Sequence, residues 1–195
     1  ASTPQIHAAD GAERAAVAKG KIEALRTECA KVRNQTLLTM EALKRLNVKG
    51  VELRPEFEKF KTELAEMEDQ AKVTRDRADC MKKNGQASFA AWEEEVKAIN
   101  NPDIRKEAQN RFAKRKKAYH KILKAMEEAR EELVPFMSDL EDIRKLLESE
   151  LTEKSVAATK CTIRSADWHG EDVRAALSDV EKEIDRVVAE LAKYK

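Results

Sequence analysis

Histidines are the first residues to consider as metal ligands or general bases, and the sequence contains three of them, His7, His120 and His169. None has a second histidine or a cysteine three or four residues further on, the spacing that puts two metal ligands on one face of a helix. His169 is the most suggestive, because the segment 167–172 (DWHGED), predicted to be a loop, places one imidazole beside three carboxylates. This segment is a candidate metal or catalytic site, and the competing interpretation is an acidic N-terminal cap of the helix that follows.

The three cysteines, Cys29, Cys80 and Cys161, are far apart and form no CxxC motif, which excludes a zinc knuckle and a thioredoxin-like motif. A hairpin of the first two predicted helices would put Cys29 opposite about residue 75, so a modest change of register would let Cys29 and Cys80 form a disulfide. The alternative is that the cysteines are buried as small apolar residues. A metal-binding, cofactor-binding or redox module built on the cysteines or on His169 is therefore one functional alternative.

Motifs that would indicate an enzyme are missing from the sequence. It has no Gly-rich phosphate loop, no GxSxG elbow and no HExxH pair. Acidic residues are so numerous that pairs of carboxylates carry no specificity. We therefore assign no catalytic, cofactor-binding or metal-binding residue, expect no cofactor, and predict that the protein is not an enzyme.

The elements that would position any functional residue are predicted to be helices. The 195 residues include 38 Lys and Arg against 37 Asp and Glu, a net charge of +1, with only five glycines and four prolines. So few turn-forming residues cannot build an all-β fold, and the balanced charge excludes a polybasic arm or an acidic disordered tail. No stretch approaches the eighteen or more apolar residues of a membrane span.

Apolar residues spaced three and four apart predict one elongated all-α domain over residues 1–195, an antiparallel helical bundle or coiled-coil hairpin. It would consist of a flexible N-terminus at 1–9 and about four long helices at 10–47, 56–100, 103–164 and 170–194. The strongest predicted turn lies at 100–103, because Pro102 cannot continue the preceding helix and Asp103 can cap the next one. Other loops are expected near 48–55 and 165–170. Pro135, inside the third helix, is expected to kink it near residues 131–135 without ending it.

The same spacing predicts which residues form the core. The apolar residues at these spacings form a stripe along each helix, called its seam. Seven seam positions of the third helix are expected to be buried against the second helix: Phe112, Tyr119, Ile122, Met126, Leu133, Phe136 and Leu140. The seam of the second helix weakens at Thr74, Gly85 and Ser88, which indicates close approach of a neighbour, a bend, or a place where another helix docks.

The segment from Arg111 to Lys124 is the best candidate for binding nucleic acid or a membrane surface. Its basic residues alternate with Phe112 and Tyr119, and clustered cations release counterions from phosphate groups. The competing interpretation is that both aromatic residues belong to the seam, leaving a solvated basic face. In a hairpin folded about Asn101, the acidic residues 93–95 would lie opposite this face and neutralise it.

Residues 56–195 resemble the DUF2959 family of bacterial proteins. The resemblance rests on FEKFK at 57–61, WEEE at 92–95 with INN at 99–101, the segment 111–129, and VPF at 134–136. The family has no established activity. The chain departs from the family after Pro135, where a stretch like LKHNLN gives way to IRKLLE at 143–148, so no role of that family histidine can be transferred.

Members of the DUF2959 family typically carry an export or lipoprotein-type leader, so the resemblance implies the periplasm or cell envelope. The start at Ala1, followed by small and polar residues, suits a processed N-terminus, although a lipid-accepting cysteine is absent from that position. We expect a non-enzymatic structural or protein-interaction protein that binds itself or another helical protein and has no small-molecule substrate. Peripheral membrane or nucleic-acid binding through residues 111–124 is the remaining alternative.

Overall fold

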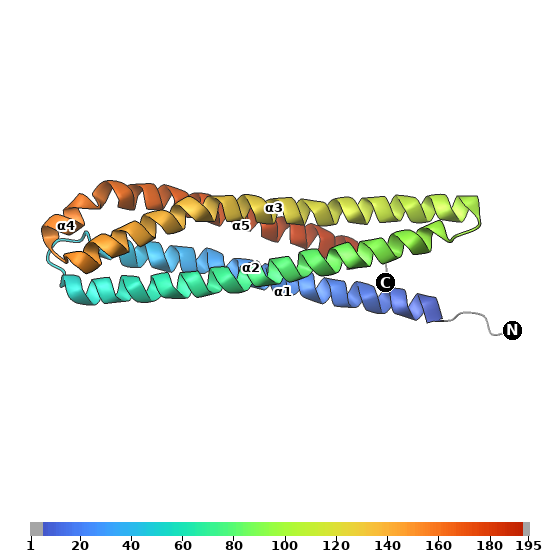
Figure 1. Cartoon of the computed structure of the whole chain (residues 1–195), viewed down its shortest axis with the longest axis horizontal. Helices are drawn as coiled ribbons and strands as arrows, with labels where there is room; N and C mark the ends of the chain where they lie inside the picture. Colours follow the sequence, from blue (N-terminus) through green and yellow to red (C-terminus); the bar gives the residue numbers. More distant parts are fainter. Residues whose placement is uncertain (1–5, 193–195) are drawn as a thin grey trace.

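The computed structural model describes residues 6–192, with side chains described from residue 16 onward, and this part of the chain is helical without strands (Figure 1). The helices are α1 (Ile6–Arg45), α2 (Leu53–Lys97), α3 (Pro102–Ser149), α4 (Glu153–Ala158) and α5 (Lys160–Ala192). The predicted all-α class is confirmed. Within the described residues, no helix combines the length and apolar character needed to cross a membrane.

The four long helices pack side by side as an antiparallel bundle. Helix α1 contacts α2 and α5, and α3 contacts α5 and α2, while the short α4 lies at one end against α3 and α5. Ion pairs fix the antiparallel register of α1 and α5, since Arg26 meets Asp185 at 2.6 Å and Lys44 meets Asp167 at 2.5 Å. The result is a rod (Figure 1).

The hairpin of α2 and α3 extends beyond the other helices at one end of the rod (Figure 1). Helix α5 ends at Ala192, and its Glu190 is paired with Lys114, so the first turns of α3 continue past α5. The turn lies where it was predicted, but the predicted cap is wrong: Asn101 caps α3 instead of Asp103, and its side chain accepts hydrogen bonds from the backbone N–H groups of Asp103 (3.0 Å) and Ile104 (3.1 Å). Pro102 occupies the first turn, where its missing N–H costs nothing.

The predicted boundaries of the last two helices are wrong. Helix α3 ends at Ser149 instead of residue 164, because Glu150 is extended and the Thr152 hydroxyl accepts a hydrogen bond from the Ser155 N–H that starts α4. The loop predicted at 165–170 is also absent, since α5 runs unbroken from residue 160. A helical glycine suits this place: a Cβ on Gly170 would lie 3.1 Å from a ring carbon of Phe136.

At the other end of the chain, α1 begins at Ile6, so residues 6–9 of the predicted flexible N-terminus are helical. Residues 1–5 of that prediction, and residues 193–194 of the last predicted helix, lie outside the described part of the chain. The turns predicted near 48–55 and 100–103 are confirmed within a few residues. Helix α3 continues through Pro135 as predicted, and its ribbon changes direction in its second half (Figure 1).

The core follows the predicted seam, with one correction to its partner. Tyr119, Ile122, Phe136 and Leu140 are buried, whereas the other three predicted positions, Phe112, Met126 and Leu133, are partly buried. Helix α3 packs more extensively against α5 than against α2, its predicted partner. The ring of Phe136 in α3 lies against Gly170 of α5. Because residues 165–170 were predicted to be a loop, this interface between α3 and α5 was not predicted.

Candidate functional site

An aromatic cluster joins α2 and α3 where the hairpin leaves the bundle. Ring centroids of Phe89 and Phe112 are 5.9 Å apart, those of Trp92 and Phe112 are 5.2 Å apart, and those of Phe89 and Tyr119 are 5.2 Å apart. These tilted and edge-on contacts are favoured by the ring quadrupoles. Phe89, Trp92 and Phe112 remain partly exposed, because neighbouring helices do not enclose the hairpin on all sides.

The close approach predicted at Gly85 is made by Tyr119. A Cβ on Gly85 would lie 2.3 Å from the Tyr119 hydroxyl oxygen, and that hydroxyl faces the carbonyl oxygens of Lys82 (3.0 Å) and Met81 (3.2 Å), to which it donates. Burial raises the pKa of Tyr119, so the phenol stays protonated as a donor. Thr74 is also buried, with its hydroxyl bonded to the Gln70 carbonyl, so Gly85 and Thr74 serve packing within the chain.

The middle of α3 contains two consecutive blocks of opposite charge. Residues 108–126, the basic block, contain seven Lys and Arg and no Asp or Glu. Residues 127–142, the acidic block, contain seven Asp and Glu and one Arg. The blocks carry +7 and −6, so the rest of a chain whose total is +1 has no net charge.

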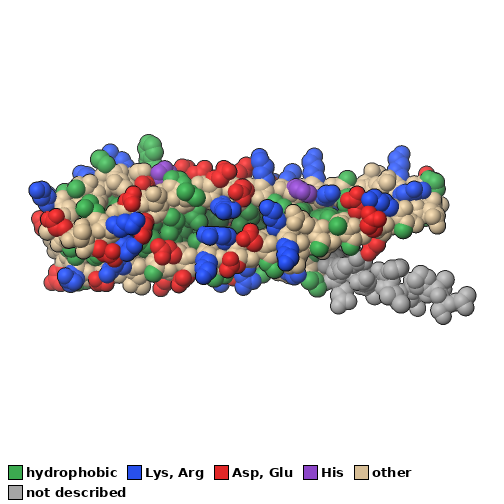
Figure 2. Space-filling model, viewed as in Figure 1, with side chains coloured by type: hydrophobic (Ala, Val, Ile, Leu, Met, Phe, Trp, Pro, Cys, Tyr) green, Lys and Arg blue, Asp and Glu red, His purple; other side chains and the backbone are tan. Residues whose placement is uncertain are grey.

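Five cations of the basic block are exposed: Arg111, Lys114, Lys117, Lys121 and Lys124. Blue side chains project along the upper edge of the rod over the first half of α3, and red ones follow along the same edge (Figure 2). The exposed members of the acidic block are Glu127, Glu128, Glu131 and Asp142. The outer face of α3 therefore changes sign along its length.

The predicted contact between the basic block and the acidic residues 93–95 is formed at Glu93. Lys116 lies 3.9 Å from Glu93, and the Arg115 guanidinium lies 5.4 Å from the Trp92 ring centroid. Glu93 and Glu94 also pair with Lys97 of their own helix, at 3.4 and 2.9 Å, and these contacts raise the pKa of Lys97.

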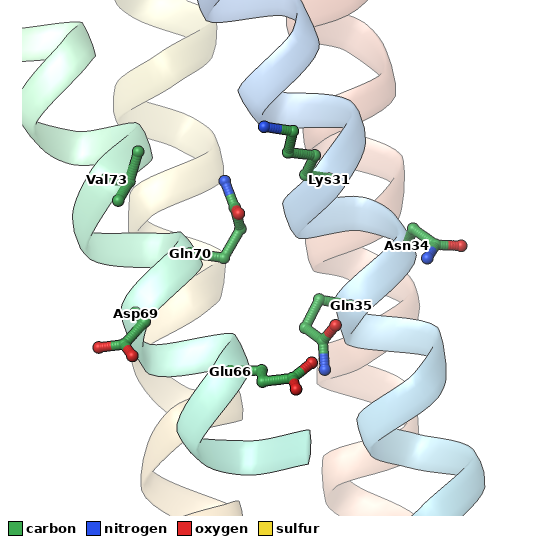
Figure 3. Close-up of a pocket in the computed structure, with 7 residues that line it drawn as sticks. All are labelled: Lys31, Asn34, Gln35, Glu66, Asp69, Gln70 and Val73. Carbon is green, nitrogen blue, oxygen red and sulfur yellow. The ribbon is translucent and has the colours of Figure 1, made fainter. Parts of the chain in front are cut away.

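A groove of about 400 Å³ lies between α1 and α2, lined by Lys31, Asn34, Gln35, Glu66, Asp69, Gln70 and Val73 (Figure 3). Two of these residues contact the buried carboxylate of Glu28, which accepts a hydrogen bond from Gln70 (2.7 Å) and pairs with Lys31 and with Arg77, each at 3.3 Å. Burial works to raise the pKa of Glu28, but these donors outweigh it and the pKa is lowered. The contacts with Gln70 and Arg77 tie α1 to α2 in one register, a structural role that no pattern in the sequence indicated.

The segment 167–172 does not form the predicted site. It lies within α5, so its residues point in different directions: Asp167 pairs with Lys44 of α1, the His169 Nδ1 lies 2.9 Å from the Asp139 carboxylate of α3, and Trp168 is 73% exposed. The cap interpretation is wrong for the same reason, since no helix starts there. Among residues whose side chains are described, no three His, Cys, Asp or Glu gather in a way that could hold a metal ion.

His120 does not take part in such a site. His120 is exposed, with its Nδ1 2.7 Å from the Lys116 carbonyl oxygen. The side chain of His7 lies outside the described residues.

The disulfide considered between Cys29 and Cys80 is not formed, and all three cysteines are free. Cys29 is buried with its sulfur 3.8 Å from that of Met126, and burial raises its pKa to about 12. Cys80 and Cys161 are exposed. Glu28, the neighbour of Cys29 in the sequence, contacts Gln70 and Arg77 of α2. Cys29 therefore lies level with this part of α2, and Cys80, further along the helix, is out of reach for a disulfide.

Comparison with known families supports the resemblance seen in the sequence. A family model described as "Protein of unknown function (DUF2959)" matches residues 11–192. The chain belongs to the DUF2959 family. The match extends the resemblance from residues 56–195 to almost all of α1. No curated protein matches the chain, so the role of this DUF2959 protein has to be argued from its own surface.

Proposed function

We propose that this DUF2959 protein is a non-enzymatic association protein of the bacterial cell envelope, a helical rod that binds a protein partner through the outer face of α3. The observation that carries the proposal is the division of this face into a basic and an acidic block. Complementary charge patterns of this kind select partners and fix their register more than they add affinity.

The packing of α3 supports the proposal, because the fold does not need the outer charges. The inward residues of α3 meet α5 and α2, and the exposed ion pairs within α3, such as Lys124–Glu128 at 3.1 Å, are each worth only about 0.2–1 kcal/mol. Lys117, Lys121 and Glu131 have no ion-pair partner within the described part of the chain. A partner with the opposite charge pattern would supply one.

A retention experiment with charge-reversed variants tests this function. The immobilised parent protein is compared with a variant carrying Lys117→Glu, Lys121→Glu and Lys124→Glu, using envelope extract of the source bacterium at low salt. A control with Lys59→Glu, Lys72→Glu and Lys83→Glu makes the same change of net charge at exposed positions of α2. We expect the parent and the control to retain a stoichiometric protein partner and the α3 variant to lose it.

Two results would overturn the function. One is that the parent retains no protein partner, itself included; the other is that both triple variants lose it equally, which would indicate a response to net charge alone. Circular dichroism on all three proteins checks that the helical fold is kept. A stoichiometric cofactor in protein purified from the source bacterium would contradict the non-enzymatic part of the proposal.

The envelope location is carried over from the expectation that the family resemblance raised. Fractionation of the source bacterium with an antibody against the native protein tests it, next to one cytoplasmic and one envelope marker. We expect the protein with the envelope marker, and recovery with the cytoplasmic marker would refute the location without affecting the surface on α3.

A further inference from the structure

Six of the exposed charges of the two blocks lie on one line along α3. Lys114, Lys117, Lys121 and Lys124 are followed by Glu128 and Glu131, with successive spacings of three and four residues. Residues at these spacings share one face of a helix. At 1.5 Å per residue, the four lysines span about 15 Å before the charge changes sign.

A uniform anionic surface fits only half of this line. A nucleic-acid strand or an anionic membrane that followed α3 past Lys124 would meet Glu127, Glu128, Glu131 and Glu132 within two helical turns. Phosphate groups would be repelled there. The face instead fits a partner that presents acidic and basic charge in the reverse order.

The same chain, turned end for end, presents that order. We propose that two copies of the protein associate with α3 antiparallel to α3, so that the basic block of each copy lies on the acidic block of the other. The inference rests on the proposed function and names its partner as a second copy.

With a two-fold axis near residue 126, Lys124 faces Glu128 of the partner subunit and Lys121 faces Glu131 of the partner subunit. Because the interface is isologous, each pair occurs twice. Lys121 and Glu131, which have no ion-pair partner within the described residues, both obtain one in this arrangement. The outer face of α3 is accessible for it, since its neighbours α2 and α5 pack against other faces of the helix.

Exposed ion pairs are weak and are screened by salt, so the dimer should be sensitive to ionic strength. Sedimentation velocity of the purified parent protein measures this. We expect dimer at about 20 mM NaCl and monomer at about 500 mM NaCl, where the Debye length shrinks to a few ångströms. The α2 triple variant described above should behave like the parent.

Two reciprocal variants identify the surface. The first carries Lys117→Glu, Lys121→Glu and Lys124→Glu, and the second carries Glu127→Lys, Glu128→Lys and Glu131→Lys. Each variant alone should be monomeric at low salt, because its α3 face then repels a second copy of itself. Mixed in equal amounts they should form a heterodimer, because the acidic face of one now complements the basic face of the other.

A parent protein that is monomeric at low salt would overturn the inference, and so would a mixture that stays monomeric while the parent dimerises. Sedimentation with vesicles of anionic phosphatidylglycerol tests the competing occupant: binding of monomers to vesicles, without dimers in solution, would overturn the inference in favour of an anionic surface. A monomeric parent that still retains an envelope protein through Lys117, Lys121 and Lys124 would refute the second copy and leave the proposed function standing.

Discussion

Replacing Gly85 by alanine tests how closely α2 and α3 approach at the base of the projecting hairpin. An alanine Cβ would lie 2.3, 2.4 and 2.6 Å from three atoms of the Tyr119 side chain. Ordinary contacts between carbon atoms are about 3.5–4.0 Å. The Tyr119 ring therefore has to move by about 1 Å, away from its hydrogen bonds to Met81 and Lys82 and its contact with Phe89.

The expected cost follows from opposing contributions. Alanine is favoured over glycine in a helix by about 0.5–1 kcal/mol. Overpacking costs about 1–3 kcal/mol, and loss of the hydroxyl hydrogen bonds costs about 0.5–1.5 kcal/mol. We therefore expect Gly85→Ala to lower the free energy of unfolding by about 0.5–4 kcal/mol. For a chain of this size, that corresponds to a melting temperature about 1–16 °C lower.

Thermal and urea unfolding followed by circular dichroism measure this change. Gly20 is the matched control, because it lies on α1 with no atom within 4 Å of an added Cβ, so Gly20→Ala should raise stability by about 0.5–1 kcal/mol. In a Tyr119→Leu background, where the long ring is gone, Gly85→Ala should lose most of its penalty. If Gly85→Ala stabilises the parent as Gly20→Ala does, the close approach argued here is wrong.

Three further predictions concern the core, the buried carboxylate and the thiols. Leu140 is fully buried and Leu133 only partly, so Leu140→Ala should cost about 2–5 kcal/mol of unfolding free energy and Leu133→Ala clearly less, as urea titrations would measure. The lowered pKa of Glu28 means that its ionised form stabilises the fold above its ordinary pKa of 4.5 and that this stability is lost as the pH falls; Glu28→Gln should flatten the decline in unfolding free energy between about pH 5 and pH 3. The buried Cys29 thiol, with its pKa raised to about 12, should react with Ellman's reagent only after unfolding, whereas the other two cysteines react in the native protein, and rapid reaction of all three would contradict the burial.

The helical fold could be predicted because its causes are local. Apolar residues at spacings of three and four, such as Phe60, Leu64 and Met67, mark the buried face of α2, and all three are buried. The turn at Asn101 and Pro102 could be predicted because a cap and a proline act on their own neighbours.

The end of α3 could not be predicted in the same way, because its seam continues in register across the break. Leu147 and Leu151 keep the apolar spacing although Glu150 is extended between them. At Gly170 the error is the opposite one, a loop predicted where a helix continues. A glycine beside polar residues is typical of a loop, but Gly170 lies inside α5 against Phe136. Whether a glycine ends a helix or admits a neighbour depends on tertiary packing, which spacing does not reveal.

Only part of the candidate surface on α3 could be predicted, because tertiary packing decides the rest. The basic block is visible in the sequence, and so is the acidic block that follows it, but their shared outer face is not. The sequence pattern favoured residues 93–95 as the opposing charges, since α2 precedes α3 in the chain. The packing of α3 against α5 decides which face is turned outward, and that contact joins residues far apart in sequence.

The packing role of α3 and its proposed binding role fall on different residues, so the binding role can be tested without disturbing the fold. Its inward side chains, including Phe136 and Leu140, are fully buried and hold the bundle together. Its outer lysines and glutamates contribute little to folding, because exposed charges stay solvated and their pairs are worth a fraction of a kcal/mol to about 1 kcal/mol. Reversing them should therefore change what the rod binds while leaving its helices in place. The proposed function rests on this boundary between five exposed cations and four exposed anions, which lies on a surface that the fold does not need.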